Sequence, residues 1–179
     1  MKRSLFLWAT VAFQLDPSVS SVTLRIRQTP LGHFEHVAPD GLAGSLRVEV
    51  DANGQVTRVE SSSLTVAVAS FRSLLPLRDE HVRKHLKASE FPRLEITELK
   101  AEKGTFRAMV SVAGASTPWE GTYDLQGGKD DLRVSAEGKL KMSAFGITPP
   151  QFKGVGVRDE VLVRGILKAL PHGDSPSIP

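Results

Sequence analysis

The stretch from Ser143 to Val161 reads Ser-Ala-Phe-Gly-Ile-Thr-Pro-Pro-Gln-Phe-Lys-Gly-Val-Gly-Val-Arg-Asp-Glu-Val and decides the fold of this chain. It joins two strand-like runs, Lys139–Ile147 and Val155–Leu170. Its adjacent prolines supply no backbone donors, and its glycines allow backbone angles that other residues avoid. Such a segment fits neither a helix nor an inner strand. The pattern therefore predicts a long antiparallel hairpin with a shaped, rigid mouth.

Outward from this hairpin, apolar and polar residues alternate with the period of two that is typical of strands with one buried face. The alternating runs are 10–15, 22–27, 42–50, 55–70, 94–97, 106–112, 119–125 and 132–142. Short turns between them favour an antiparallel meander over βαβ units, whose crossovers need helices. The length of 179 residues fits one domain, such as an eight-stranded barrel with one helix. We expect this domain over residues 1–170 and a disordered, proline-containing tail over 171–179.

One segment breaks the period of two and predicts a short helix over about residues 77–89. Acidic residues occupy its first turn and lysines its last turn, as the helix dipole favours. Val82 and Leu86 lie one turn apart and form a short apolar stripe. The Phe91-Pro92 step then ends the element. A single helix in an all-β meander is suited to close one end of a barrel as a lid or plug.

Motifs in several parts of the chain resemble those of the YceI-like family. The hairpin matches the family's S-x-F-G-I…G…V-x-D-E-V ending, and the helix matches an R-D-x-H motif that leads through a Y/F-P-x-I/L step into a strand. An opening motif, I-D-P-x-H-S-x-V, has Val19 or Ser20 in place of its histidine, and a G-x-T-x-P turn is a weaker match. The matching segments are 15–22, 78–81, 91–94, 114–118 and 143–161.

The resemblance implies an all-β fold, namely an antiparallel eight-stranded lipocalin-like β-barrel with one short α-helix over about 77–89. YceI-like proteins hold a polyisoprenoid or a similar long lipid inside this barrel. We therefore expect the chain to bind a polyisoprenoid, an isoprenoid quinone or a related lipid as a carrier or storage protein, without a further cofactor. Family members also dimerise, so the resemblance implies a homodimer.

The apolar faces of the strands supply the candidate lining of such a tunnel. An eight-stranded barrel can be filled by its own side chains or hold one ligand. Alternation alone leaves both interpretations open, and the resemblance favours the ligand tunnel. The predicted lining residues are Phe13, Leu24, Ile26, Phe34, Leu46, Leu64, Val66, Val68, Leu86, Ile96, Phe106, Val110, Trp119, Leu140, Met142 and Phe145. Small residues that would leave room are Gly44, Ala67, Ala108, Gly121, Ala136, Gly138 and Gly165.

Polar residues near the predicted mouth could bind a lipid head group, and the candidates are Arg78, His81 and Arg158. Arg78 and Asp79 could instead pair with each other and hold the helix against the mouth. The pair Asp159 and Glu160 is expected to be a structural charge cluster, because consecutive strand residues point to opposite faces.

Two histidine pairs, His33/His36 and His81/His85, have spacings that can place two imidazoles on one metal ion. We expect boundary residues of an amphipathic helix at His81 and His85, and no metal site. An enzyme that uses these histidines on a lipid or small substrate is the alternative function. A ligand-free interaction module in a stress or secretion pathway is another.

Composition narrows the remaining classes. The chain has no cysteine, which excludes disulfides, thiolate metal sites and cysteine nucleophiles. Its 23 basic and 20 acidic residues are interspersed, which does not favour nucleic-acid binding. No apolar run approaches the length of a transmembrane segment. The first ten residues begin like a signal peptide but lack its full length, so we expect cytoplasmic residence, or a periplasmic one if the true start lies upstream.

Overall fold

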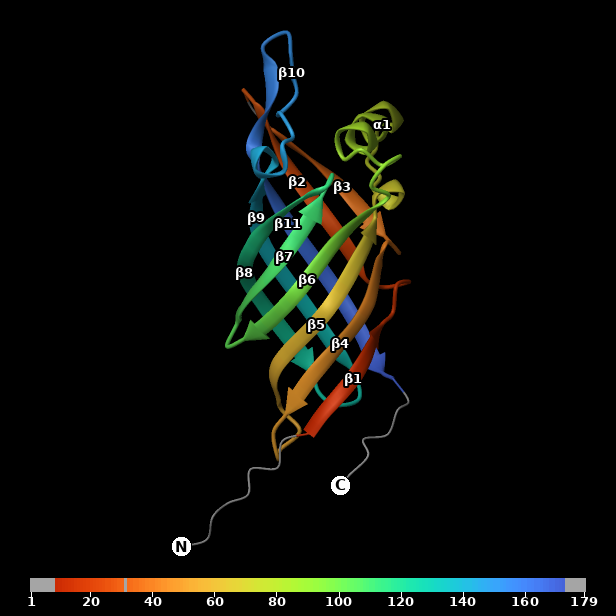
Figure 1. The fold of residues 1–179 in the computed structure, drawn as a ribbon, viewed down its shortest axis with the longest axis vertical. Helices are drawn as coiled ribbons and strands as arrows, with labels where there is room; N and C mark the ends of the chain where they lie inside the picture. Colours follow the sequence, from red (N-terminus) through yellow and green to blue (C-terminus); the bar gives the residue numbers. More distant parts are fainter. Residues whose placement is uncertain (1–8, 31, 173–179) are drawn as a thin grey trace, which may run out of the picture.

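The computed structural model describes residues 9–30 and 32–172, and its fold is an antiparallel β-barrel with one α-helix (Figure 1). The strands of the first half are β1 (Ala9–Leu15), β2 (Ser21–Thr29), β3 (His33–Pro39), β4 (Leu42–Val50) and β5 (Val56–Ala67). Those of the second half are β6 (Arg93–Glu102), β7 (Thr105–Val112), β8 (Ala115–Gly127), β9 (Leu132–Lys141), β10 (Gln151–Phe152) and β11 (Val155–Pro171). The helix is α1 (Pro76–His85), and two 3-10 turns are η1 (Val68–Ser70) and η2 (Met142–Phe145).

Eight strands close into a ring in the order β1-β4-β5-β6-β7-β8-β9-β11, with β11 pairing back onto β1. The closing pair aligns Phe13 with Pro171 and Leu15 with Ala169. All of these pairings are antiparallel, and β4 through β9 follow one another in sequence, with short turns except between β5 and β6, where η1 and α1 intervene. The predicted eight-stranded antiparallel barrel with one helix is therefore confirmed.

The long strand β11 holds the two ends of the barrel together. On one edge it pairs first with β2, over residues 156–166, and then with β1, over residues 169–171, and on the other edge residues 160–169 pair with β9. The predicted hairpin is the β9–β11 pair, and β10 forms a small tongue on it at the mouth. The hairpin β2–β3 extends the wall beyond β1 toward α1 (Figure 1).

Several predicted boundaries were wrong. The strand-like run Lys139–Ile147 ends at Lys141, because η2 begins at Met142. The strand expected over 55–70 ends at Ala67, because η1 turns the chain there. The helix expected over about 77–89 ends at His85, and Lys87 takes a left-handed backbone angle, φ 51°, that stops it. Pro171 belongs to β11 rather than to a disordered tail. The rest of that tail, residues 173–179, and the signal-like residues 1–8 lie outside the described residues.

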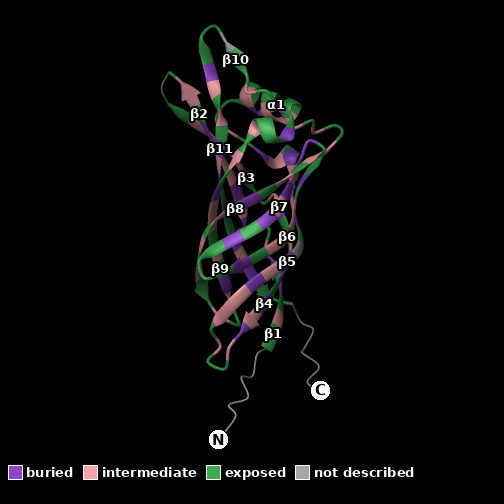
Figure 2. Cartoon of the chain, turned by 60° about the vertical axis from the view of Figure 1, so that its left-hand side comes forward, coloured by how far each residue is buried: buried purple, intermediate pink, exposed green. Residues whose placement is uncertain are grey.

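Along the strands, buried residues alternate with half-buried or exposed ones (Figure 2), and most of the buried residues are apolar. On β11, Val161, Val163, Gly165, Leu167 and Ala169 are all buried, while the residues between them are exposed or half-buried. The buried residues form one apolar core cluster inside the ring. Among the described residues, no helix has both the length and the apolar character that crossing a membrane requires.

Candidate functional site

Two apolar cavities follow one another inside the barrel. The lower cavity, toward the chain termini, has a volume of about 60 Å³, and the upper cavity, toward α1, has about 90 Å³. Side chains of Val22, Ile96, Trp119 and Val163 line both cavities. The two cavities are therefore compartments of one tunnel that meet at these four residues, which we call the waist. The walls of both compartments expose almost no polar surface.

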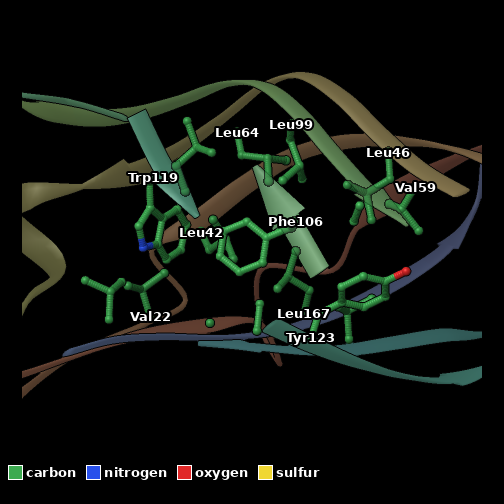
Figure 3. Close-up of a pocket in the computed structure, with 16 residues that line it drawn as sticks. Val22, Leu42, Leu46, Val59, Leu64, Leu99, Phe106, Trp119, Tyr123 and Leu167 are labelled. Atoms are coloured by element: carbon green, nitrogen blue, oxygen red, sulfur yellow. The ribbon is translucent and has the colours of Figure 1, made fainter. Parts of the chain in front are cut away.

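Two aromatic rings narrow the tunnel at and below the waist (Figure 3). Phe106 and Trp119 meet edge to face with centroids 4.6 Å apart. The glycines beneath them make this possible: a Cβ on Gly121 would lie 2.7 Å from the Phe106 ring, and one on Gly138 would lie 2.5 Å from Nε1 of Trp119. These two glycines were expected to leave the tube open. They make room for the rings instead.

The indole N–H of Trp119 is buried and has no hydrogen-bond partner. Only 6% of this residue is exposed, and Figure 3 shows its nitrogen at the edge of the indole away from Phe106. A buried water needs two to four polar partners, and the apolar walls of both compartments do not supply them. The waist therefore holds one buried indole donor without a protein acceptor, packed beside Gly138 of the wall.

Most of the predicted lining residues face the tunnel. Twelve of the sixteen line one or both compartments, namely Leu24, Leu46, Leu64, Val66, Leu86, Ile96, Phe106, Val110, Trp119, Leu140, Met142 and Phe145. Phe13, Ile26 and Val68 are buried but line neither compartment, and Phe34 is half-buried against Arg78. The period of two predicts the face on which a residue lies but not its height along the barrel, and Val68 leaves the strand altogether.

Residues that sequence reasoning missed lie mostly on the same inward faces. They are Val22, Leu42, Val59, Leu94, Leu99, Ala101, Val112, Tyr123, Val134, Lys141, Ile147, Val161, Val163 and Leu167. Ala136 and Gly165, which were expected to leave room inside the tube, line the lower compartment. Val22 and Val134 share the alternating faces of residues that were predicted, so the pattern could have found them. Leu99 could not be found in this way, because the β6–β7 register shifts between Thr97 and Lys100.

A buried histidine–aspartate pair joins α1 to the wall at the upper end. His36 on β3 is fully buried, and its Nδ1 lies 3.4 Å from Oδ1 of Asp79 on α1 without hydrogen-bond geometry. Asp79 also accepts the backbone N–H of Ser73 at 2.7 Å. Burial lowers the pKa of His36, opposed by the Asp79 charge. Burial would raise the pKa of Asp79, but hydrogen bonds from Ser73 and the nearby His36 keep it below its usual value.

The candidate head-group residues do not converge on the tunnel. Arg78 lies over the ring of Phe34, 4.3 Å from its centroid, and so it does not pair with Asp79 as one interpretation proposed. His81 and Arg158 are exposed, and neither lines a compartment.

The histidine pairs separate as well. His33 is exposed whereas His36 is buried, and His81 and His85 are both exposed rather than at the edge of a buried face. Within residues 9–30 and 32–172, no three His, Asp or Glu side chains are grouped so that they could hold a metal ion. The geometry that the alternative enzyme requires is not assembled by these four histidines.

A model of the YceI-like domain matches residues 13–169. The chain belongs to the YceI-like family. Its fold is similar to that of BcnA from Burkholderia cenocepacia, with a TM-score of 0.66 and 16% identity over 86% of this chain and 98% of that one. The fold is also similar to that of a polyisoprenoid binding domain from Saccharophagus degradans, implicated in plant cell wall breakdown. The TM-score is 0.65 and the sequence identity 12%, over 90% of this chain and 99% of that one. A Campylobacter jejuni YCEI protein matches with a TM-score of 0.52 and 18% sequence identity, over 72% of this chain and 81% of that one. No curated protein sequence matches the chain.

The structure gives the YceI-like motifs of this chain a physical meaning. Asp159 accepts hydrogen bonds from the backbone N–H and the hydroxyl of Ser143, at 2.7 and 2.5 Å, and these bonds lower the pKa of Asp159. They fix η2, which places Phe145 in the upper compartment. In the opening motif, Asp16 likewise accepts the N–H and hydroxyl of Ser18 at the turn between β1 and β2. Both motif carboxylates are scaffold, as predicted for Asp159.

Proposed function

We propose that this YceI-like protein binds a long apolar amphiphile, a polyisoprenoid, isoprenoid quinone or related lipid, inside its barrel as a carrier or storage protein. The observation that carries this proposal is the pair of small apolar compartments inside the barrel, which adjoin at the waist. Apolar cavities of this kind stay dry and take up apolar molecules. The similarity in fold to a polyisoprenoid binding domain supports the same ligand class.

The energetics suit a chain-like ligand. Each buried CH₂ group contributes about 0.8 kcal/mol, so one five-carbon isoprene unit gives roughly 4 kcal/mol. Two or three units therefore offset an association cost of about 4–15 kcal/mol. The compartments are narrow, so binding requires flexible side chains such as Met142 and Leu86 to rotate aside. Selectivity then comes mainly from the length and bore of the tunnel.

The unpartnered N–H of Trp119 favours a ligand with an oxygen acceptor over a pure hydrocarbon. An isoprenoid quinone carries carbonyl oxygens on a flat ring that can reach the waist, followed by a tail for the adjoining compartment. A hydrocarbon would leave the donor unpaired as it is in the free protein, whereas a carbonyl oxygen that pairs with it would remove that cost. Among the proposed ligands, we therefore prefer the quinone.

Native mass spectrometry of freshly purified protein, followed by lipid extraction, tests the proposal. We expect a co-purifying hydrophobic mass in the wild type and its loss in Ala136→Phe, which fills the lower compartment. The matched control is Ser135→Phe on the same strand, because Ser135 is exposed and should leave the lipid in place. Absence of any bound lipid, together with failure to bind added isoprenoid quinone, would refute the proposal.

A further inference from the structure

Three leucines at the start of α1 are unusually exposed. Leu74 is 98% exposed, Leu77 is 67% and Leu75 is 50%. Other large exposed apolar residues of the described chain occur singly along the sequence, at Val19, Val155, Ile166 and Leu170. Scattered apolar residues at a surface are ordinary, but a cluster within four positions marks an interaction site. We call residues 74, 75 and 77 the leucine edge.

The helix continues this edge with a polar outward face. Asp79 is buried and Val82 and Leu86 are half-buried, so this side of α1 faces the barrel. On the opposite side, Leu77 and Lys84 are both exposed and lie two turns apart. Figure 2 shows α1 mostly exposed at the end of the barrel that is remote from β1. The leucine edge therefore projects from the mouth of the tunnel and is not folded back onto the wall.

The positive charge of the chain is concentrated around this edge. Residues 72–93 contain six Arg or Lys and three Asp or Glu, and one of these acids, Asp79, is buried against His36. The whole chain has 23 basic and 20 acidic residues, which leaves 17 of each outside this segment. The formal excess of +3 thus resides entirely in the segment that carries the exposed leucines.

We propose that the leucine edge and the basic face of α1 dock on an anionic phospholipid surface. An anionic membrane surface attracts lysines and arginines by charge, and neighbouring apolar side chains insert between its head groups. A second copy of the chain is a poorer occupant, because two like-charged edges would face each other. Leu86, at the end of α1, lines the upper compartment, so docking brings the tunnel mouth to the membrane. The evidence for the docking surface is the exposure and charge of its residues, and it does not depend on the proposed function. Only the use of this surface for lipid uptake rests on the proposed function.

Flotation of the full chain with vesicles tests the docking. We expect binding to equimolar phosphatidylcholine and phosphatidylglycerol, and weak binding to pure phosphatidylcholine. The double variant Leu74→Gln/Leu77→Gln should lower the partition coefficient on anionic vesicles about tenfold or more, since each exposed leucine contributes apolar area. Lys84→Glu should lower it several-fold on anionic vesicles and leave binding to neutral vesicles unchanged.

The matched control is Val19→Gln/Ile166→Gln, which removes two half-exposed apolar residues away from α1 and should bind like the wild type. Equal binding by the leucine variant and the wild type would overturn the proposal, as would failure of the wild type to float with anionic vesicles. If the leucine variant instead converts a dimer to a monomer in analytical ultracentrifugation, the edge is a subunit interface and the proposal is wrong. Vesicle binding does not require bound ligand, so a protein without co-purifying lipid can still pass this test.

Discussion

The strand β1 and the helix α1 lie at opposite ends of the same barrel and close it by different physical means (Figure 1). β1 is hydrogen-bonded on both edges, to β4 and β11, and its inward residues Phe13 and Leu15 are 0% and 2% exposed. α1 joins no sheet, and the residue that it buries is Asp79. One end is therefore closed by strand pairing and complete apolar burial, and the other by a polar contact.

This difference indicates which end opens. Separating β1 from its neighbours would expose backbone groups of two ladders and fully buried side chains, which approaches global unfolding. Lifting α1 breaks the Asp79 contacts with Ser73 and His36 and the Arg78–Phe34 contact, and the apolar side chains of α1 that it exposes, such as Val82, are half-buried already. Low-stability elements of this kind are where binding proteins open. We therefore expect a ligand to enter and leave at α1.

The largest expected effect is at the β1 end. Phe13→Ala removes a fully buried ring and should lower the free energy of unfolding by about 3–5 kcal/mol. The comparison variant at the other end, Leu86→Ala, should cost much less, because this residue is half-buried beside a cavity that can adjust. Urea unfolding of both variants gives the two values. Equal losses would show that the two ends are closed with similar strength.

The next effect is at the anchor of α1. Asp79→Ala leaves the Ser73 N–H without its acceptor and His36 without the neighbouring carboxylate, and should cost about 1–3 kcal/mol. Glu80→Ala is the matched control, because its carboxylate is exposed on the same turn and should change stability by less than about 0.5 kcal/mol. Hydrogen exchange of the α1 amides should rise in the first variant alone. If exchange in the β1–β11 pair rises equally, α1 does not open independently.

A smaller effect is expected at the waist, between the two ends. Trp119→Phe removes the indole N–H and keeps an aromatic ring, so affinity for a short-tailed isoprenoid quinone should fall about two- to tenfold. The isoprenoid hydrocarbon of the same length serves as the control ligand and should bind both proteins equally well. Fluorescence or calorimetric titration measures both ligands. An equal loss for both would show that ring volume, and not the donor, controls binding at the waist.

Much of the barrel was predictable because each wall strand repeats one local rule. A residue that faces the interior must be apolar, and the period of two records this at every step, as in β11. The strand β3 was not predicted, because its inward face consists of Phe34, His36 and Ala38, and the histidine interrupts the apolar alternation. The rings over Gly121 and Gly138 also escaped prediction, since their contact joins residues from neighbouring strands. Ligand, oligomeric state and compartment stay predictions.

The burial of Asp79 shows the limit of local rules most directly. An acidic residue in the first helical turn satisfies the helix dipole in isolation, so the sequence pattern predicted only the start of a helix and a possible partner at Arg78. Its actual partner, His36, is 43 positions away on β3. Nothing in a one-dimensional pattern records that pairing, because it depends on how β3 passes beneath α1.

The smallest expected effect is a pH dependence that acts through the same anchor. The pKa of His36 lies below its ordinary 6.5, because burial disfavours the charged ring more than Asp79 favours it. As the pH falls through about 6.5, His36 therefore takes up a proton in the unfolded chain but not in the folded chain. The free energy of unfolding is highest above that pH and decreases as the pH falls below it. The lowered pKa of Asp79 has the same sign, but its contribution is lost only in stronger acid, below its ordinary 3.8. Unfolding midpoints between about pH 8 and pH 5 should thus decline in the wild type and less in His36→Gln, which keeps the four exposed histidines. If the unfolding midpoints of the wild type and of His36→Gln decline equally with pH, His36 does not contribute to the pH dependence of stability. Acid would then not loosen α1 in preference to β1.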